Sequence, residues 1–346
     1  MISVDYLHEI LVKVLTTPSP SGYTHQVISL IREVAKEFGH SVTLTKKGAA
    51  IITIPGKDPS KVIGLSAHVD TLGAMVRSIT SKGLLKITPI GGFMYQTIEG
   101  EYCEIFTRTG KTFTGTILTT KPSVHVFKDA RKQERTDEVI EIRIDEKVKK
   151  KKDVEELGIN AGDFIAFDSR TVVTPTGFIK SRHLDDKASV GILLSVLECF
   201  HREKIIPKNT VKIFISNYEE VGHGLSFLPE GIDELIAIDM GAIGDDLSTT
   251  EYDVSICAKD SSGPYDYHLT NHLIELAKKQ EIQYAVDIYP FYGSDASAAL
   301  RAGHDVPTAL IGPGVHASHS LERTHTEALI NTAKLLITYL TEGIEE

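Results

Sequence analysis

Residues 211–222 read VKIFISNYEEVG, an apolar run followed closely by two adjacent carboxylates. The run from Val211 to Ile215 predicts a buried strand that ends shortly before Glu219 and Glu220. Neighbouring side chains at the end of a strand leave in different directions, so one carboxylate can bind a metal while the other transfers a proton. The pair therefore indicates a hydrolase.

Four further junctions place a potential metal ligand beside an apolar run. Residues 62–67 precede His68, which can bind a metal, and Asp70, which can orient the imidazole. The others have Asp239 after residues 235–238, His316 and His319 after residues 307–311, and Asp185 and Asp186 before the amphipathic run 188–200. The carboxyl ends of parallel strands meet at one edge of a sheet, so we expect these side chains to converge there. Their composition suits two zinc-like ions that share a bridging carboxylate.

Each motif alone has an ordinary structural explanation, because His-x-Asp and Glu-Glu are more often solvated or capping features than metal sites. Their shared position at strand ends favours a common site. Ser294 and Asp295 are weaker candidates, since either residue can simply cap a helix over residues 296–300.

Length and composition limit the class of protein. A chain of 346 residues with 41% hydrophobic content can form one large domain and a smaller one. A net charge of −10 argues against general binding to nucleic acid or to anionic membranes, and Lys149 to Lys152 are expected to form a solvated loop. Three cysteines without a Cys-x-x-Cys motif suit a reducing compartment. With neither a leader pattern nor a membrane-span pattern, we expect a cytoplasmic protein.

The periodicity of the sequence changes twice along the chain. Apolar residues recur at helical spacing over residues 24–38, before the strand that leads to His68. Residues 71–177 then consist of short alternating stretches with Gly-rich turns, such as residues 112–118, which predict a small all-β insert. Helices and strands alternate again after Arg182. We therefore expect residues 1–70 and 178–346 to form one discontinuous α/β domain, interrupted by the insert.

Six motifs carry a resemblance to a known family. They are Ala67-His68-Val69-Asp70, Arg182-His183-Leu184-Asp185-Asp186-Lys187, Glu219-Glu220-Val221-Gly222, Ile238-Asp239-Met240-Gly241, Gly293-Ser294-Asp295-Ala296 and His319-Ser320-x-Glu322. In order and spacing the chain resembles the M42 family of dinuclear metalloaminopeptidases over nearly its whole length. The resemblance implies a zinc-peptidase-like α/β/α catalytic domain with an inserted small β-barrel domain that takes part in oligomerisation. It also implies a homo-oligomer, up to a tetrahedral dodecamer, that removes residues one at a time from the free N-termini of peptides.

Residue by residue, the resemblance implies two divalent metal ions. One ion is expected on His68 and Asp239 and the other on Glu220 and His319, with Asp185 bridging the two. Zn²⁺ is the first expectation, and Co²⁺ or Mn²⁺ are the alternatives, because these ligands do not distinguish them. Glu219 is expected to be the general base, and Asp70 is expected to support catalysis from behind His68.

The chain departs from the usual family pattern at Thr71 and Tyr218, where Glu and Gln are common. It also has His316-Ala317-Ser318 where Arg-Tyr often precedes the last ligand. His319 is therefore the expected ligand, His316 is the alternative, and His325 is a further histidine nearby in sequence.

Two other functions stay open at this point. A glycan hydrolase needs two free carboxylates and usually aromatic platforms, whereas this chain has no Trp. An inactive scaffold of the same fold is the third possibility. The sequence does not predict which N-terminal residue is preferred.

Overall fold

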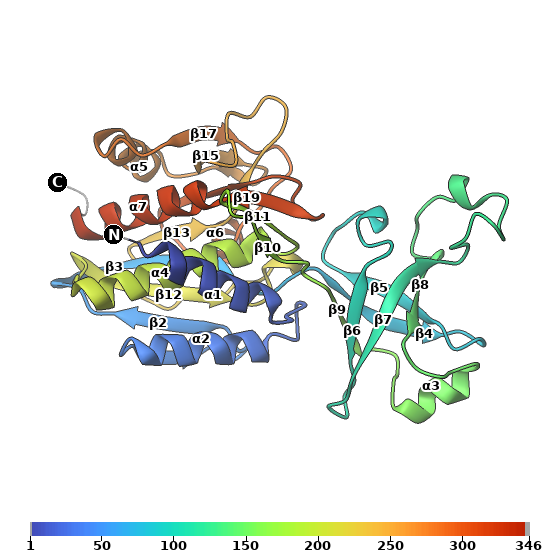
Figure 1. The fold of residues 1–346 in the computed structure, drawn as a ribbon. Helices are drawn as coiled ribbons and strands as arrows, with labels where there is room; N and C mark the ends of the chain where they lie inside the picture. Colours follow the sequence, from blue (N-terminus) through green and yellow to red (C-terminus); the bar gives the residue numbers. More distant parts are fainter. Residues whose placement is uncertain (1, 343–346) are drawn as a thin grey trace. The chain divides into compact units, whose positions relative to one another are not determined.

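The computed structural model describes residues 2–342, which form two compact units (Figure 1). The first unit contains the residues up to Asp70 and those from Arg170 onward, and the second contains Thr71–Ser169. Each unit has its own hydrophobic core. The predicted fold class, an α/β domain with an inserted β-barrel, is confirmed.

The first unit is built on a ten-stranded sheet. Its strands follow the order β1 (Val42–Leu44), β2 (Ala50–Ile54), β12 (Asn209–Ser216), β3 (Asp58–His68), β13 (Glu234–Ile238), β18 (Thr308–Val315), β15 (Val254–Asp260) and β16 (Gly263–Pro264), with β17 (Tyr284–Ile288) paired to β15 and β14 (Gly241–Ala242) paired to β18. The central strands β12, β3, β13 and β18 are parallel. Their carboxyl ends therefore lie at the same edge of the sheet.

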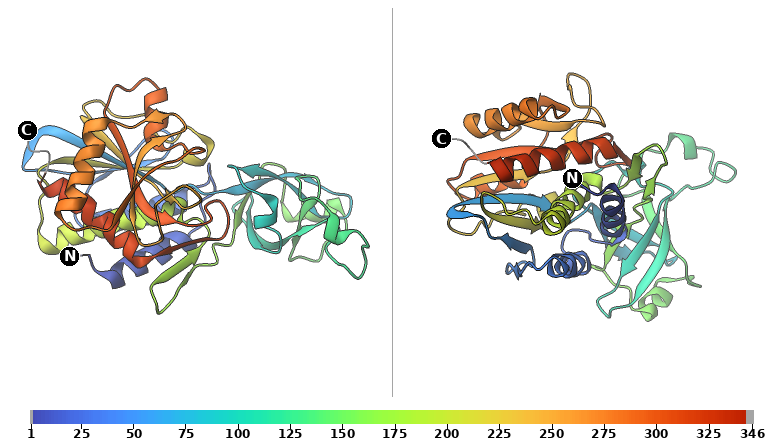
Figure 2. Two further views of the ribbon diagram at one scale, coloured as in Figure 1. Left: turned by 90° about the horizontal axis from the view of Figure 1, so that it is seen from above. Right: turned by 60° about the vertical axis from the view of Figure 1, so that its left-hand side comes forward.

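Helices cover both faces of this sheet. One face packs against α1 (Val4–Thr16), α2 (His25–Glu37), α4 (Leu184–Glu203), α5 (Tyr267–Lys279) and α7 (Thr326–Glu342), and the other packs against α6 (Asp295–Arg301). The strand residues alternate accordingly, because Ile213 and Ile215 belong to the first core and Phe214 to the second. Figures 1 and 2 show α1 (dark blue) beside α4 (yellow-green), although the two helices are distant in sequence.

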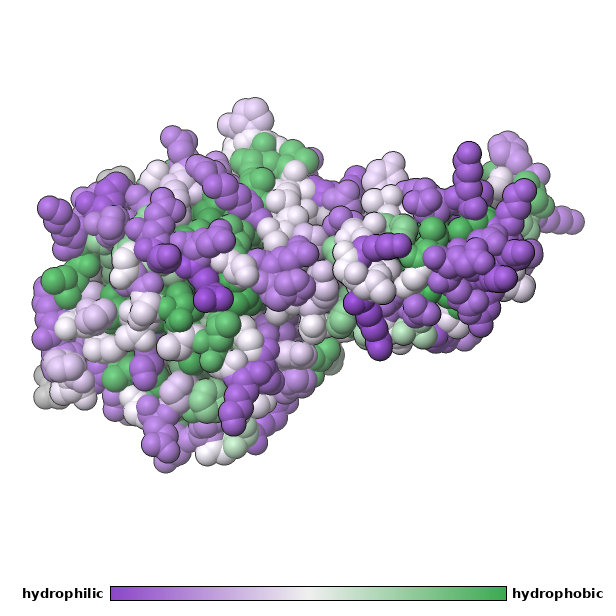
Figure 3. All heavy atoms as spheres, turned by 90° about the horizontal axis from the view of Figure 1, so that it is seen from below, coloured by the Kyte–Doolittle hydropathy of each residue, from purple (hydrophilic) through white to green (hydrophobic). Residues whose placement is uncertain are grey.

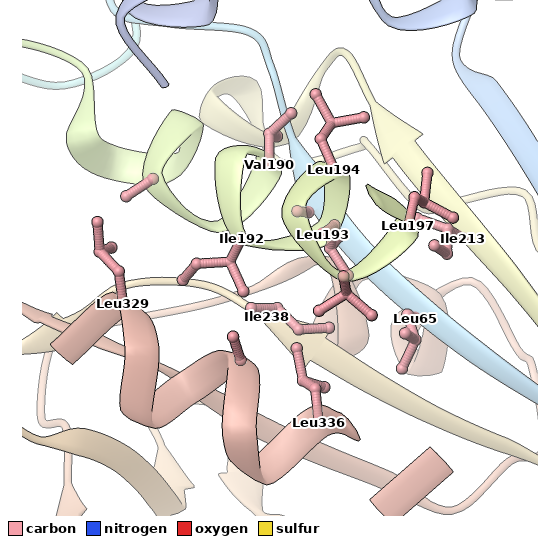
Figure 4. Close-up of a cluster of buried hydrophobic side chains, with 14 of the residues drawn as sticks. Leu65, Val190, Ile192, Leu193, Leu194, Leu197, Ile213, Ile238, Leu329 and Leu336 are labelled. Atoms are coloured by element: carbon pink, nitrogen blue, oxygen red, sulfur yellow. The ribbon is translucent and has the colours of Figure 1, made fainter. Parts of the chain in front are cut away.

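Helix α4 is the most enclosed of the elements that carry site residues. Figure 4 shows Ile192 and Leu193 on the side of α4 that faces α7, near Leu329, Leu336 and Ile238. Burial of each such side chain contributes about 1.5–3 kcal/mol. Asp185 and Asp186 lie in the first turn of this helix. Their positions are therefore tied to a helix that is buried along most of its length.

The second unit is a closed barrel. Its strands follow the order β4 (Gly73–Ile79), β5 (Leu85–Ile90), β8 (Ile140–Ile144), β7 (Thr112–Thr119), β6 (Tyr102–Phe106) and β9 (Phe164–Phe167), and β9 pairs with β4 to complete the ring. Closure leaves no open sheet edge between these strands. Its core includes Ile87, Ile105, Ile117 and Ile142, which come from alternate strand positions.

The barrel unit differs from the expected insert in two respects. It is not entirely β, because it contains α3 (Lys151–Leu157) and the short 3₁₀ turns η1 (Tyr95–Thr97) and η2 (Ala130–Lys132). The predicted solvated loop at Lys149–Lys152 thus runs into a helix, whose start is held by Asp153, which accepts hydrogen bonds from the backbone N–H groups of Lys149 and Lys150.

The second difference is the boundary of the insert. The compact unit ends at Ser169, whereas the sequence suggested about residue 177. Residues 172–173 form β10 (Val172–Val173), which pairs with β11 (Phe178–Ser181), and β11 pairs with β19 (Glu322–His325). This three-stranded sheet joins residues 172–181 to the first unit.

On the face shown in Figure 3, most side chains are hydrophilic (purple), and smaller apolar areas (green) lie among them. Among the described residues, no helix is both long enough and apolar enough to cross a membrane.

Candidate metal centre

The predicted site residues converge at the carboxyl edge of the central sheet. His68 is the last residue of β3 and is the register partner of Ser216, the last residue of β12. Glu219 and Glu220 follow in the 3₁₀ turn η3 (Glu219–Val221), and Asp239 comes directly after β13. Asp185 enters from the first turn of α4, and His319 enters from the loop before β19.

Asp185 lies between the two imidazoles. Its Oδ1 is 3.2 Å from Nε2 of His68, and its Oδ2 is 3.3 Å from Nε2 of His319. His319 Nε2 is also 3.5 Å from Oε2 of Glu220, and His68 Nε2 is 3.7 Å from Oε2 of Glu219. The two oxygens of one carboxylate thus face two different histidines, which is the arrangement that a bridging ligand requires.

Two groups of three residues have ligand atoms that all lie within 4.8 Å of one another. One group is His68, Asp186 and Asp239, and the other is His68, Asp185 and Glu220. Asp186 lies in a motif that the sequence highlighted, but it was not among the five expected ligands. His319 belongs to neither group, but its contacts with Asp185 and Glu220 place it beside the second.

The charge balance of the centre fits divalent cations. Asp185, Asp186 and Asp239 are buried, and no Lys or Arg of residues 2–342 forms an ion pair with them or with the Glu219–Glu220 pair. In addition, Oδ1 of Asp186 is buried without a hydrogen-bond partner. Buried carboxylates need a compensating charge. Imidazole and carboxylate ligands match zinc and similar ions, so the residues present fit such ions.

The pKa values of the clustered carboxylates reflect their burial and their closeness to one another. Burial raises the pKa of Glu220 to about 8 and that of Asp239 to about 7, with a further increase from the nearby Asp185. Burial also raises the pKa of Glu219 well above its ordinary value. For Asp185 burial acts in the same direction, but hydrogen bonds with His319 and His68 outweigh it and hold the pKa below its usual range.

Asp70 acts on the centre differently from expectation. The His68 Nδ1–H group donates to the main-chain carbonyl oxygen of Asp70 at 2.9 Å, whereas the nearer carboxylate oxygen is 3.6 Å away. The carboxylate instead accepts the backbone N–H groups of Glu219 at 3.1 Å and Glu220 at 3.2 Å, and the hydroxyl of Ser21 at 2.5 Å. The main chain of Asp70 therefore orients the imidazole, and its side chain fixes the turn that carries the two glutamates.

Two more buried carboxylates hold the ligand loops. Glu322 accepts the N–H of Asp185 at 3.1 Å through Oε2 and the N–H of His319 at 3.0 Å through Oε1. Asp295 accepts the N–H of Leu225 at 2.9 Å and the hydroxyl of Ser216 at 2.5 Å, which joins α6 to the segment around η3. Both lie in motifs that the sequence highlighted, where Glu322 was assigned no role and Asp295 was considered only as a weak candidate or a helix cap.

The two other histidines near the end of the sequence motif lie elsewhere. His316 is exposed and forms an isolated bridge with Arg323 through backbone hydrogen bonds. His325 packs against the rings of Phe178 and Tyr252, and its Nε2 is 2.8 Å from the carbonyl oxygen of Thr176. Of the three candidates, only His319 faces the carboxylates.

This geometry agrees with comparisons to known proteins. A family model described as M42 glutamyl aminopeptidase matches residues 48–335. The chain belongs to the M42 family. It is therefore a peptide hydrolase of an aminopeptidase family, and the matched range contains every site residue described above from His68 to Glu322.

Two curated relatives cover almost the whole M42 chain. Putative aminopeptidase YhfE of Bacillus subtilis (strain 168) is 53% identical over 341 residues, which is 98% of this chain and 99% of the relative. Lysyl aminopeptidase of Pyrococcus furiosus is 25% identical over 349 aligned positions, covering 96% of each chain.

Solved structures share the M42 fold. A TET aminopeptidase from the marine sediment archaeon Thaumarchaeota archaeon SCGC AB-539-E09 has a TM-score of 0.87 and 21% identity, covering 97% of each chain. PhTET1-12s, described as a dodecamer in the asymmetric unit, has a TM-score of 0.84 and 23% identity, covering 99% of this chain and 100% of that chain.

A pocket of about 490 Å³ opens beside the M42 centre. Its wall includes Asp185, Glu219, Glu220, Asp239 and His319 at one end. The remaining wall comes from the segments that follow β13 and β17 and from Ser318, in the loop before β19. A substrate in this pocket would therefore lie against the residues of the centre.

Proposed function

We propose that this M42 chain is a dinuclear metal-dependent aminopeptidase that releases residues from the N-termini of peptides. The observation that carries the proposal is Asp185, whose two oxygens each face a different imidazole. A single carboxylate in that position can hold two cations close together. Both the family match and the buried carboxylates of the centre, which have no Lys or Arg partner among the described residues, support this function.

In this proposal the ions are held by the five residues expected from the sequence, with Asp186 as an additional candidate. His68 and Asp239 would hold one ion, Glu220 and His319 would hold the other, and Asp185 would bridge them. Zn²⁺ is the first candidate, with Co²⁺ and Mn²⁺ as alternatives. When bound, such ions supply Lewis-acid chemistry, which polarises a carbonyl group and acidifies water.

Glu219 is the proposed general base. Its carboxylate lies in the pocket wall and faces the same space as the ligands, with Oε2 3.7 Å from His68 Nε2. It would accept a proton from the attacking water and return that proton to the leaving amine. The Asp70 carboxylate would keep the base in place, because it binds the backbone N–H groups of both glutamates.

Recognition of a free N-terminus follows from the charge of the centre. Several carboxylates line the pocket beside the proposed ions, and such a site favours a protonated or metal-bound amine, which an acetylated N-terminus does not offer. The proposed reaction is therefore sequential release from free N-termini.

A homo-oligomer, up to a dodecamer, is part of the proposal. The M42 resemblance and the similarity to dodecameric PhTET1-12s support it, and the barrel unit is the proposed oligomerisation domain. A cytoplasmic location is supported by the three cysteines, which are buried and free. We expect neither a nucleic-acid nor a membrane partner.

The glycan-hydrolase alternative has less support from the site. A glycosidase needs two carboxylates free to flank a glycosidic bond. Here Asp185 and Glu220 face imidazoles instead. Neither a glycosidase nor an inactive scaffold has a use for a paired metal centre.

The experiment that tests the function compares one peptide with a free N-terminus and the same peptide after N-acetylation. Mass spectrometry of the digest should show stepwise loss of residues from the free peptide and little cleavage of the acetylated one. A chelator should stop the reaction, and added Zn²⁺, Co²⁺ or Mn²⁺ should restore it. Internal fragments, or equal rates on both peptides, would contradict an aminopeptidase.

A further inference from the structure

The pocket beside the metal centre changes character along its length. Part of its wall is formed by the four carboxylates of Asp185, Glu219, Glu220 and Asp239 and by the imidazole of His319. The rest of the wall includes Met240, Ala242, Leu247, Tyr289, Phe291 and Tyr292. These residues follow β13 and β17, so two loops at the carboxyl edge of the sheet shape this part of the pocket.

Outside the metal centre, no described residue of the pocket wall carries a charge. The two acidic residues of the loop after β13, Asp245 and Asp246, are exposed and are not part of the wall. A lysine or glutamate side chain in this part of the pocket would therefore lose water without gaining a partner of opposite charge.

The polar groups of the two tyrosines in the wall are already engaged. The Tyr292 hydroxyl donates to the carbonyl oxygen of Met240 at 2.9 Å. The Tyr289 hydroxyl is hydrogen-bonded to Ser255. The two side chains thus present mainly their rings to a ligand.

Phe291 marks the mouth of the pocket. It is 97% exposed, although an aromatic ring of this size is usually partly covered in a folded protein. Because Phe291 is also part of the pocket wall, its ring is available to a ligand in the pocket. A bound apolar side chain would cover this ring.

We propose that this pocket receives the side chain of the N-terminal residue and selects a neutral apolar residue, such as Leu, Met or Phe, over Lys or Glu. The inference rests on the proposed aminopeptidase function. In that reaction the amine and the scissile carbonyl lie at the metal centre, and the side chain between them enters the adjoining space. Leu247 and Phe291 are the proposed specificity-determining residues.

The proposed preference for an apolar residue differs from the preferences that the names of some relatives indicate. The family model is described as glutamyl aminopeptidase, and the Pyrococcus furiosus relative is described as a lysyl aminopeptidase. A site for a charged side chain needs a group of opposite charge in its wall, and a missing partner weakens binding of that side chain.

The first arm of the test is a panel of Leu, Met, Phe, Lys and Glu chromogenic amides, assayed with the full-length protein and Zn²⁺, Co²⁺ or Mn²⁺. We expect kcat/KM for the best apolar residue to exceed that for Lys and Glu by at least roughly tenfold. A preference for Lys or Glu would overturn the pocket assignment and leave the aminopeptidase intact. No turnover of any amide with any metal would count against the proposed function itself.

The second arm of the test changes residues of the pocket wall and measures whether the substrate preference changes with them. Leu247→Glu adds a carboxylate to the wall, so the Lys/Leu ratio of kcat/KM should rise, whereas Leu247→Met, which keeps the wall apolar, should leave it unchanged. Phe291→Ala removes an exposed ring without opening the core. It should lower kcat/KM for the Leu and Phe amides relative to kcat/KM for an Ala amide, whose side chain is too small to need the ring. Tyr267→Ala, at an exposed aromatic residue outside the pocket wall, is the matched control. Unchanged ratios in both Leu247→Glu and Phe291→Ala would overturn the proposal.

Discussion

At the residue scale, adjacent acidic residues have different surroundings. Glu220 contacts His319, while Glu219 is near His68, and both backbone N–H groups are held by the Asp70 carboxylate. The same division occurs at Asp185 and Asp186, since one faces both imidazoles and the other accepts the N–H of His68 at 3.1 Å. Local backbone direction therefore decides what each of two neighbouring carboxylates can do.

The first prediction separates the base from the ligand. Glu219→Gln keeps the shape of the side chain but removes the proton acceptor, so kcat should fall by roughly 10²-fold or more while metal content stays near normal. Glu220→Gln should instead lose metal, because an amide is a weaker ligand than a carboxylate. Elemental analysis and steady-state kinetics of both variants check this. Equal metal loss in the two variants would mean that the roles are assigned wrongly.

The second prediction concerns Glu322, whose carboxylate holds the backbone of two proposed ligands, Asp185 and His319. Glu322→Gln leaves only one side-chain oxygen to accept two backbone N–H groups, those of Asp185 and His319. Because residues that orient metal ligands affect affinity, we expect metal binding to weaken by about 10–100-fold. Competition with a chelator measures the affinity. Glu9→Gln, at a solvent-exposed residue of α1 whose partner is Lys13, is the control and should bind metal normally. Unchanged metal affinity in Glu322→Gln would show that Glu322 does not support the metal ligands.

All five predicted ligands come together in the structure, because each follows or precedes an apolar element that ends at the same sheet edge. The position of Asp186 beside His68 and Asp239, and the main-chain role of Asp70, could not be predicted. Sequence order shows that a carboxylate is near the centre, but the direction in which it points depends on backbone geometry around His68 and the start of α4.

At the element scale, the segment after β12 depends on a close approach to α6. A Cβ atom on Gly224 would lie 2.2 Å from Oδ1 of Asp295 and 3.0 Å from the backbone nitrogen of Glu219. Asp295 cannot move freely, since it also accepts hydrogen bonds from Ser216 and Leu225. There is therefore no room for a larger residue than glycine at position 224.

The third prediction follows from this contact. Gly224→Ala should displace the turn that carries Glu219 and Glu220 and lower kcat/KM by at least roughly tenfold, because small shifts of catalytic groups have large effects on rate. Gly92→Ala is the matched control, since a Cβ atom there meets no neighbour within 4 Å. Kinetic measurements on both variants, with circular dichroism to confirm folding, decide the point. Wild-type kinetics in Gly224→Ala would show that the segment can adjust at no cost.

The strands and helices around the site were predictable because their apolar patterns are long and regular. The expected helix over residues 24–38 is α2, and the run 188–200 lies within α4. By contrast, α3 has one fully buried residue, Val154, so its sequence carries almost no apolar period. The two-residue strand β10 is held by pairing with β11, and a strand that short has no sequence pattern of its own.

At the scale of the whole molecule, the chain divides into an α/β unit and a barrel unit, and all the residues of the proposed centre lie in the first. The discontinuous order of these units was predictable from the change in periodicity. The end of the insert was not, because β11 also pairs with β19, which lies much later in the chain.

The fourth prediction is a large homo-oligomer. If the barrel unit takes part in assembly, light scattering at micromolar concentration should give a mass many times the 38.0 kDa of one chain. Deleting residues 73–167 and joining the flanks should then reduce the assembly. A wild-type protein that stays a strict monomer would contradict the proposed assembly.

The most direct test of the account is the number of metal ions in each subunit. Elemental analysis of active protein should give two equivalents of Zn²⁺, Co²⁺ or Mn²⁺ per chain, because Asp185 faces both His68 and His319. Asp185→Asn should lower the occupancy of both sites together, since it removes the shared ligand. One equivalent or fewer in fully active protein, or two retained equivalents in Asp185→Asn, would contradict a dinuclear centre bridged by this residue.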